Sequence, residues 1–195
     1  MTATLEPAKT KNLEKIEQVF LRPIRFTSSM FERMLETGVI GDDPRVELLD
    51  GQIVEMEPVK PEHILRVKDI YDRLVPQMSN AMVLNQSSIE LPSDGCPQPD
   101  ITLLRSETPR DRLACPEDVL LLIEVSDSTL EKDRNAKLAL YARDGIQEYW
   151  IVNLQDDQLE VYRDPQRERY TTSFTVKPGT NQACLAFPED AIDWS

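Results

Sequence analysis

The chain has 195 residues, and its 40% hydrophobic and 29% charged residues are typical of a folded globular protein rather than a disordered one. Acidic residues number 35 and basic residues 22, and the resulting net charge of −13 argues against binding nucleic acid through bulk charge. This charge does not exclude a local site that handles phosphate through metal ions.

Several common classes of protein lack support in the sequence. The three cysteines have no C-x-x-C spacing, so we expect a reduced, cytoplasmic chain. The longest aliphatic run, Val119–Ile123, is too short to cross a bilayer, and we expect no membrane partner. His63 is the only histidine, so the sequence gives little support to a Ser-His-Asp triad or a histidine-rich metal site. No glycine-rich nucleotide-binding loop occurs either.

The beginning of the chain is predicted to hold an arm, a helix and a hairpin. We expect an N-terminal arm over residues 1–24 and a single domain over residues 25–195. Residues 29–38 carry the apolar stripe and the closing glycine of a helix. Asp50-Gly51 separates two apolar runs and predicts a two-residue hairpin over residues 46–56.

A second helix is predicted to begin at Pro61 and to be ended or bent by Pro76. One or two short strands over residues 82–91 and a strand over residues 100–104 should follow. The apolar period of the helix is carried by Ile64, Val67, Ile70, Tyr71, Leu74 and Met78.

The rest of the chain alternates between strands and a helix. Residues 119–125 form the most hydrophobic run, which indicates a strand that is buried on both faces. A helix over residues 128–144, a strand over residues 148–154 and further short strands over residues 163–195 complete the pattern. This order predicts an α/β protein with a mixed sheet flanked by helices.

Glu124 is a charge in an unfavourable place, because it lies inside the predicted buried strand between Ile123 and Val125. A lone ionised carboxylate there is costly, so Glu124 should be paired, protonated or bound to a cation. The alternative is a carboxylate at an exposed end of the strand.

Lys137 is a second unusual charge, because it falls on the apolar arc of the following helix. Its ammonium group either snorkels to solvent or points into a polar site. Since the strand and the helix are consecutive, the helix should pack back on the sheet and bring Lys137 near Glu124, at the carboxyl end of the strand. The other residues of the arc are Leu130, Arg134, Leu138 and Tyr141.

Two further acids complete the set of candidates. Asp100 follows Pro99 at the start of a predicted strand, where the alternative is an ordinary turn aspartate. Glu47 follows Val46 in the hairpin, where the alternative is the polar face of an alternating strand.

Together these residues resemble the PD-(D/E)XK nuclease superfamily, whose fold is restriction-endonuclease-like, and more closely its Uma-type family of bacterial endonucleases. The resemblance covers residues 25–165 and is densest over residues 124–152. In the simplest superfamily pattern the lysine stands at the position of Ser126; in the Uma-type family it lies on the following helix, where Lys137 matches it. The matching stretches are Val46–Gly51, His63, Pro99–Ile101, Leu122–Thr129, Asp133, Lys137, Tyr141 and Asp144–Val152.

The resemblance implies a metal-dependent endonuclease that hydrolyses phosphodiester bonds in nucleic acid, with DNA as the expected substrate and Mg²⁺ or Mn²⁺ as the cofactor. Asp100 and Glu124 are then the expected metal ligands, with the backbone carbonyl of Val125 as a third. Lys137 would orient or help deprotonate the attacking water and meet the charge that develops on phosphate. Glu47 would serve a second metal or position Lys137.

Two residues are weaker candidates. Gln86 is assigned to the edge of the site from its strand position alone. His63 matches a family position, although a histidine at the start of a helix more often has a structural role.

The sequence is compatible with other functions as well. A catalytically silent nuclease-fold protein that binds or assembles is the main alternative, and the net charge of −13 favours it. A carboxylate-based glycosidase fits less well, because aromatic residues make up only 6% of the chain and Lys137 would have no role. A homodimer is expected of a restriction-like nuclease that cuts both strands.

Overall fold

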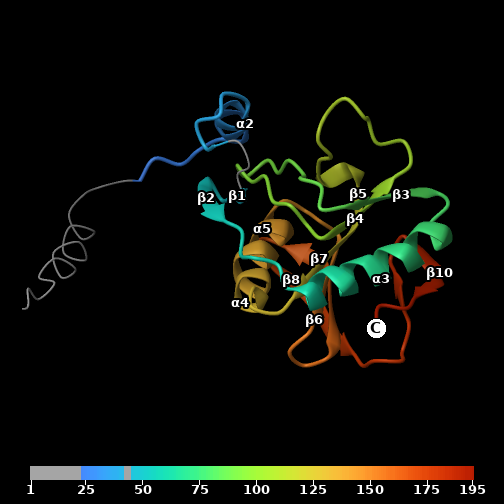
Figure 1. Cartoon of the computed structure of the whole chain (residues 1–195). Helices are drawn as coiled ribbons and strands as arrows, with labels where there is room; N and C mark the ends of the chain where they lie inside the picture. Colours follow the sequence, from blue (N-terminus) through green and yellow to red (C-terminus); the bar gives the residue numbers. More distant parts are fainter. Residues whose placement is uncertain (1–22, 42–44) are drawn as a thin grey trace, which may run out of the picture.

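The computed structural model describes residues 23–41 and 45–195, so the predicted arm over residues 1–24 lies outside the described residues except for its last two. A six-stranded sheet forms the centre of the molecule, with helices on both faces (Figure 1). In spatial order its strands are β3 (Ala81–Asn85), β4 (Ile101–Arg105), β5 (Val119–Ser126), β6 (Glu148–Asn153), β7 (Gln158–Gln166) and β8 (Arg169–Val176).

The sheet is mixed, because β5 and β6 run parallel while the other neighbours in it are antiparallel. A parallel pair needs a crossover connection, and the helical segment between β5 and β6 supplies it. That segment consists of α4 (Leu130–Lys132), the π-helix η2 (Asp133–Lys137) and α5 (Leu138–Arg143). The predicted α/β architecture, a mixed sheet flanked by helices, is confirmed.

β5 divides the core, because its alternate side chains point to opposite faces of the sheet. Leu121 and Ile123 pack in the cluster that contains the buried residues of α3 (Pro61–Gln77). Leu122 packs with Leu140 and Tyr141 of α5 in the other cluster. The prediction that this strand is buried on both faces is confirmed, and Glu124 therefore points to the α4–α5 side.

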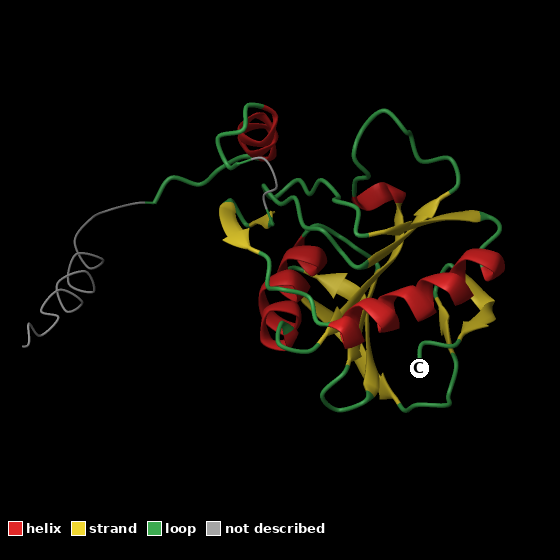
Figure 2. Cartoon of the chain, in the orientation of Figure 1, coloured by secondary structure: helices red, strands yellow, loops and turns green. Residues whose placement is uncertain are grey.

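α3 covers one face of the sheet, as Figure 2 shows, and buries Val67, Ile70 and Leu74. Ile64 does not belong to this stripe, because it is 51% exposed. Pro76 lies in the last turn, and the helix ends one residue later, which agrees with the predicted stop.

The hairpin β1 (Val46–Leu49) and β2 (Gln52–Glu55) forms a sheet of its own beside the central one. Asp50 and Gly51 have φ angles of 49° and 71°, the left-handed pair that a type I′ turn requires. A bridge between Leu48 and Cys96 attaches the hairpin to the loop that leads to β4.

The remaining elements lie at the periphery. The helix α2 (Ser28–Glu36) begins one residue earlier than predicted, because the Thr27 side chain caps it by accepting from the Met30 amide. A short turn, η1 (Pro116–Asp118), precedes β5, and a second hairpin, β9 (Gln182–Cys184) with β10 (Phe187–Ile192), ends the chain. None of the helices in the described ranges is long and apolar enough to cross a membrane.

Candidate functional site

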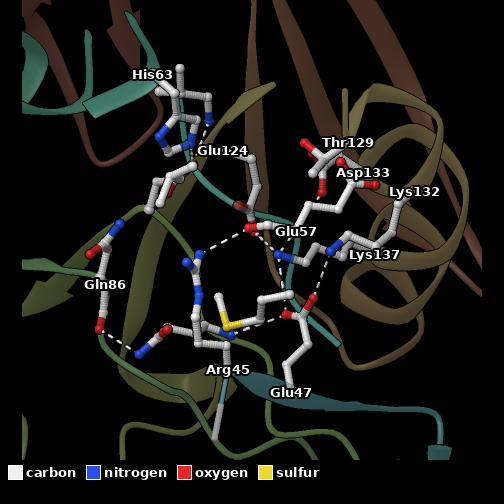
Figure 3. A pocket seen from close by; sticks show the side chains of 15 residues that line it. Arg45, Glu47, Glu57, His63, Gln86, Glu124, Thr129, Lys132, Asp133 and Lys137 are labelled. Atoms are coloured by element: carbon white, nitrogen blue, oxygen red, sulfur yellow. Dashed lines mark hydrogen bonds and ion pairs between the residues drawn. The ribbon is translucent and has the colours of Figure 1, made fainter. Parts of the chain in front are cut away.

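A cavity of about 410 Å³ opens beside β5 and collects side chains from the hairpin, α3, the ends of β3 to β5, and the α4–η2 segment (Figure 3). All four residues predicted to carry chemistry line it, together with Val125 and the weaker candidates His63 and Gln86. The structure therefore brings the predicted site residues to one place, while their chemical roles remain predictions.

The strand register explains why Asp100 and Glu124 converge. β4 pairs antiparallel with β5 and sets Ile101 against Ile123, so continuing the register by one residue puts Asp100 opposite Glu124. Directly opposite residues share one face of a sheet and lie close together. Asp100 is 8% exposed and Glu124 4%, which excludes both the ordinary turn aspartate and the exposed strand end.

Lys137 lies between two carboxylates (Figure 3). Its Nζ is 2.8 Å from Oε1 of Glu124 and 3.3 Å from Oε2 of Glu47. Since the residue is only 3% exposed, its ammonium group does not snorkel to solvent. Tyr141, one turn further along the helix, donates its hydroxyl to the same Oε1 of Glu124 at 3.0 Å.

Glu47 reaches the cavity from β1, where it is 1% exposed. Its Oε1 is 2.9 Å from Nζ of Lys132, and its Oε2 accepts the Gln98 amide at 3.4 Å besides facing Lys137. Glu47 is therefore buried and paired through both oxygens, which excludes the polar-face alternative.

His63, on the first turn of α3, is part of the site. Its Nε2 is 3.0 Å from Oδ2 of Asp100, and the Val125 amide donates to the same oxygen at 2.8 Å. Gln86 follows β3 with a φ of 46°, its amide donates to the Asp100 carbonyl, and its own carbonyl accepts from the Gln98 side chain. Gln86 is thus fixed at the rim of the cavity, as its strand position indicated.

Some charged residues of the lining received no role from the sequence, among them Arg45, Lys132 and Asp133. Asp133 and Lys137 are four apart on one helix, a spacing that could have paired them in advance. The sequence offered no such signal for Arg45, which stands between Pro44 and Val46, or for Lys132, which stands between Glu131 and Asp133.

The electrostatics of the site follow from burial and pairing. Burial raises the pKa of Glu124 above its usual value, although the charge of Lys137 opposes the shift. Burial alone would lower the pKa of Lys137, but the charges of Glu124, Glu47 and Asp133 outweigh it and raise that pKa above its usual value. For Glu47 burial acts to raise the pKa, and the two lysines reverse this and lower it.

The donor set fits a hard divalent cation held mainly by two carboxylates. Glu124 uses Oε1 for Lys137 and Tyr141, and Asp100 uses Oδ2 for His63 and Val125, so Oε2 and Oδ1 make no hydrogen bond to a described residue. Mg²⁺ is commonly bound by one or two carboxylates, with water and phosphate completing its shell. Within residues 23–41 and 45–195, no three acidic, histidine or cysteine side chains are arranged to hold a metal by themselves.

Comparisons with known proteins identify the family and the fold of the chain. The model of the Uma2 family, described as "Putative restriction endonuclease", matches residues 29–194. No curated protein matches the chain. Among solved structures, one titled "Crystal structure of a putative nuclease belonging to DUF820 from Anabaena variabilis ATCC 29413" is similar over 88% of this chain and 96% of that chain, with a TM-score of 0.64.

The two chains share 16% identity, so this likeness shows the fold alone. It supports the predicted restriction-endonuclease-like core. The family match, in contrast, spans most of the sequence, including every predicted site residue from Glu47 to Lys137. The chain therefore belongs to the Uma2 family, whose description is "Putative restriction endonuclease".

Proposed function

We propose that the protein is a Mg²⁺-dependent endonuclease that hydrolyses phosphodiester bonds in DNA. The observation that carries the proposal is the position of Lys137, which is buried between Glu124 and Glu47 while Asp100 lies across from Glu124 in the same cavity. A lysine amine, two carboxylates with a free oxygen each and an open cavity are the groups that metal-assisted phosphodiester hydrolysis needs.

Each side chain has a defined task in this reaction. Asp100 and Glu124 would hold the cation, with the Val125 carbonyl as a third ligand. A bound Mg²⁺ supplies positive charge to the phosphate and activates water. Lys137 stays protonated, so its Nζ donates hydrogen bonds: it orients the attacking water and meets the negative charge on the phosphate oxygens. Water adds to phosphorus and releases a proton to solvent, the bond to the leaving oxygen breaks, and that oxygen takes up a proton from solvent.

The test is a cleavage assay with supercoiled, linear and single-stranded DNA, and with RNA, in Mg²⁺, in Mn²⁺ and in EDTA. We expect cleavage of DNA with either metal and none in EDTA. Glu124→Gln and Lys137→Met should each lower kcat by about 100-fold or more, since each removes a charge that acts on the transition state.

Two exposed residues provide matched controls. Glu131→Gln removes a carboxylate beside the site, and Lys177→Met removes a distant ammonium group, and both should retain activity within about twofold. No cleavage of any substrate by the wild type, or equal cleavage by the wild type and both site variants, would reject the proposal.

A catalytically silent binding protein is the second candidate. It is favoured by the absence, among the described residues, of three metal-binding side chains grouped around one point, and by the net charge of −13. Calorimetric titration with Mg²⁺ separates the two functions. The nuclease should bind Mg²⁺ and lose that binding on Asp100→Ala, whereas a silent protein should show no binding that this change removes.

A homodimer is part of the proposal, because one such site per chain cuts one strand at a time. Light scattering on the purified protein, with and without duplex DNA, measures the mass directly. A monomer under both conditions would remove the dimer from the proposal without affecting the single-strand chemistry.

A further inference from the structure

The helix that carries Lys137 is irregular at the site. Residues Asp133–Lys137 form a π-helical stretch between α4 and α5. A π-helix is rare, occurs mostly as single turns inside α-helices and is frequent at functional sites. Its wider turn inserts one extra residue, so every later side chain is rotated relative to its place in a continuous α-helix. The direction of Lys137 therefore depends on what stabilises this turn.

Asp133, the first residue of the π-turn, is attached to the sheet from two strands. Its Oδ2 accepts the hydroxyl of Ser126 at 2.7 Å, and its backbone carbonyl accepts the hydroxyl of Tyr149 at 3.3 Å. The same carbonyl accepts the Leu138 amide, which is the long-range bond of the π-turn. Ser126 stands two residues after Glu124 on β5 and shares its face, so one strand fixes both the carboxylate and the start of the π-turn.

The other oxygen of Asp133 is buried without a hydrogen bond. The residue is 2% exposed, and its Oδ1 has no hydrogen-bond partner. Lys137 Nζ lies 3.9 Å from it, the longest of the three carboxylate distances around this ammonium group (Figure 3). A buried carboxylate oxygen without a hydrogen bond lowers stability, so the presence of Oδ1 at this position needs a physical reason.

The three carboxylates around Lys137 differ in the other groups that they contact. Glu47 is shared with Lys132, and Glu124 is shared with Tyr141 and with the proposed cation. Oδ1 of Asp133 faces Lys137 with no competing hydrogen bond. We infer that Asp133 is a positioning residue for Lys137, held in place by Ser126, and that it keeps the ammonium group directed into the cavity while Glu124 serves the metal. This inference rests on the proposed function.

Kinetics provide the first test, with Asp133→Asn and Ser126→Ala. Asp133→Asn keeps the shape and removes the charge, and Ser126→Ala removes the hydroxyl that fixes Oδ2. Each should lower kcat by about 10- to 100-fold with KM within about twofold, as expected for a partner that orients a reacting group. The double variant should be no worse than Asp133→Asn alone, because both changes act through one contact. Glu131→Gln, which keeps a side-chain oxygen for Asn135, and Glu189→Gln on β10 change exposed residues; they are the controls and should match the wild type.

Metal affinity separates positioning from ligation. Calorimetric Mg²⁺ titration of Asp133→Asn should give a Kd within about threefold of the wild type, whereas Asp100→Asn should weaken binding at least about tenfold. If Asp133→Asn weakens Mg²⁺ binding as much as Asp100→Asn does, Asp133 is a ligand and the inference is overturned.

A readout without DNA or metal keeps the two proposals distinguishable. In protein labelled with ¹⁵N-lysine, the buried Lys137 ammonium group should exchange its protons slowly, and Lys137→Met identifies its resonance. Asp133→Asn and Ser126→Ala should each speed this exchange about tenfold or more, and Glu131→Gln should not. If the wild type cleaves no nucleic acid, the proposed function fails and the exchange rate still tests Asp133. Unchanged exchange in Ser126→Ala, the smaller change, together with unchanged exchange or loss of folding in Asp133→Asn, overturns the inference.

Discussion

At the scale of single residues, the contacts of Glu47 distinguish between the two roles that the sequence left open for it: binding a second metal or positioning Lys137. Its Oε1 faces Lys132, and its Oε2 faces Lys137 and the Gln98 amide. A carboxylate that is engaged through both oxygens has little left to offer a second metal. Its contacts instead fix Lys137 from the side opposite to Glu124, so the geometry favours a positioning task for Glu47.

We therefore predict that Glu47→Gln lowers kcat by about 10- to 100-fold and leaves the Kd for Mg²⁺ within about threefold. The reason is that the amide keeps the shape but withdraws one negative charge from Lys137. Calorimetry and single-turnover cleavage on the same preparations measure both quantities. A loss of Mg²⁺ affinity as large as that of Asp100→Asn would instead assign Glu47 to a second metal.

Glu124 and Lys137 could be predicted because each is a charge among apolar neighbours, and the cost of an unpaired buried charge forces a partner. Lys132 could not, because its sequence neighbours are polar and its contact with Glu47 joins segments 85 residues apart. No sequence pattern indicated a role for the hydroxyl of Ser126 either. Its importance comes from the 2.7 Å contact with Asp133, which exists only once β5 and the π-turn have packed together.

At the scale of elements, the sequence correctly predicted the features that depend only on residues close together in the chain. The Asp50-Gly51 hairpin formed as expected, since its turn type is set by the two residues themselves. The helical segment predicted over residues 128–144 is present from Leu130 to Arg143, but a π-turn that the sequence did not indicate interrupts its α-helical geometry. Hydrophobic periodicity does not distinguish the two forms, and the contacts that hold the π-turn come from other elements. Among them is the pair between Arg134 and Glu160, with Arg134 Nε 3.0 Å from Oε2.

The terminal hairpin β9–β10 is attached to the sheet by a buried ion pair. Arg163 on β7 places Nη2 2.7 Å from Oε1 of Glu148 on β6 and donates to the Ala183 carbonyl of β9. Glu148 is fully buried, and its Oε2 accepts the Leu185 amide between the two strands of the hairpin. Both partners thus touch the hairpin, so the pair joins three elements.

Arg163→Met should lower the free energy of unfolding by about 3 kcal/mol, because it leaves the Glu148 carboxylate buried without its cation. Denaturant titration followed by circular dichroism measures the change. Arg169→Met, an exposed arginine of β8, is the control and should stay within about 0.5 kcal/mol of the wild type. Equal stabilities for the two variants would show that the ion pair does not hold the hairpin.

At the scale of the whole molecule, the net charge of −13 limits how the protein meets a polyanion. Many arginines and lysines are already paired with acids, as in the contacts of Arg143 with Asp50, Lys60 with Asp127 and Arg112 with Asp118. At the cavity, Arg45 is exposed and the Lys132 side chain is 26% exposed, so these two cations are the ones that phosphate reaches most easily. The proposed nuclease should therefore bind DNA locally, at its site, rather than along a basic face.

This limit predicts a weak dependence of DNA affinity on salt. Each phosphate contact contributes about −0.9 to the slope of log K against log salt concentration, so two contacts give a slope of about −2. Fluorescence anisotropy of a labelled duplex with Ca²⁺ in place of Mg²⁺ measures the slope without cleavage. Arg45→Ala and Lys132→Ala should each bring the slope about one unit closer to zero, and Lys177→Ala should not change it. A slope steeper than about −5 would contradict this prediction, because it would require an extended basic surface, which the net charge of −13 does not favour.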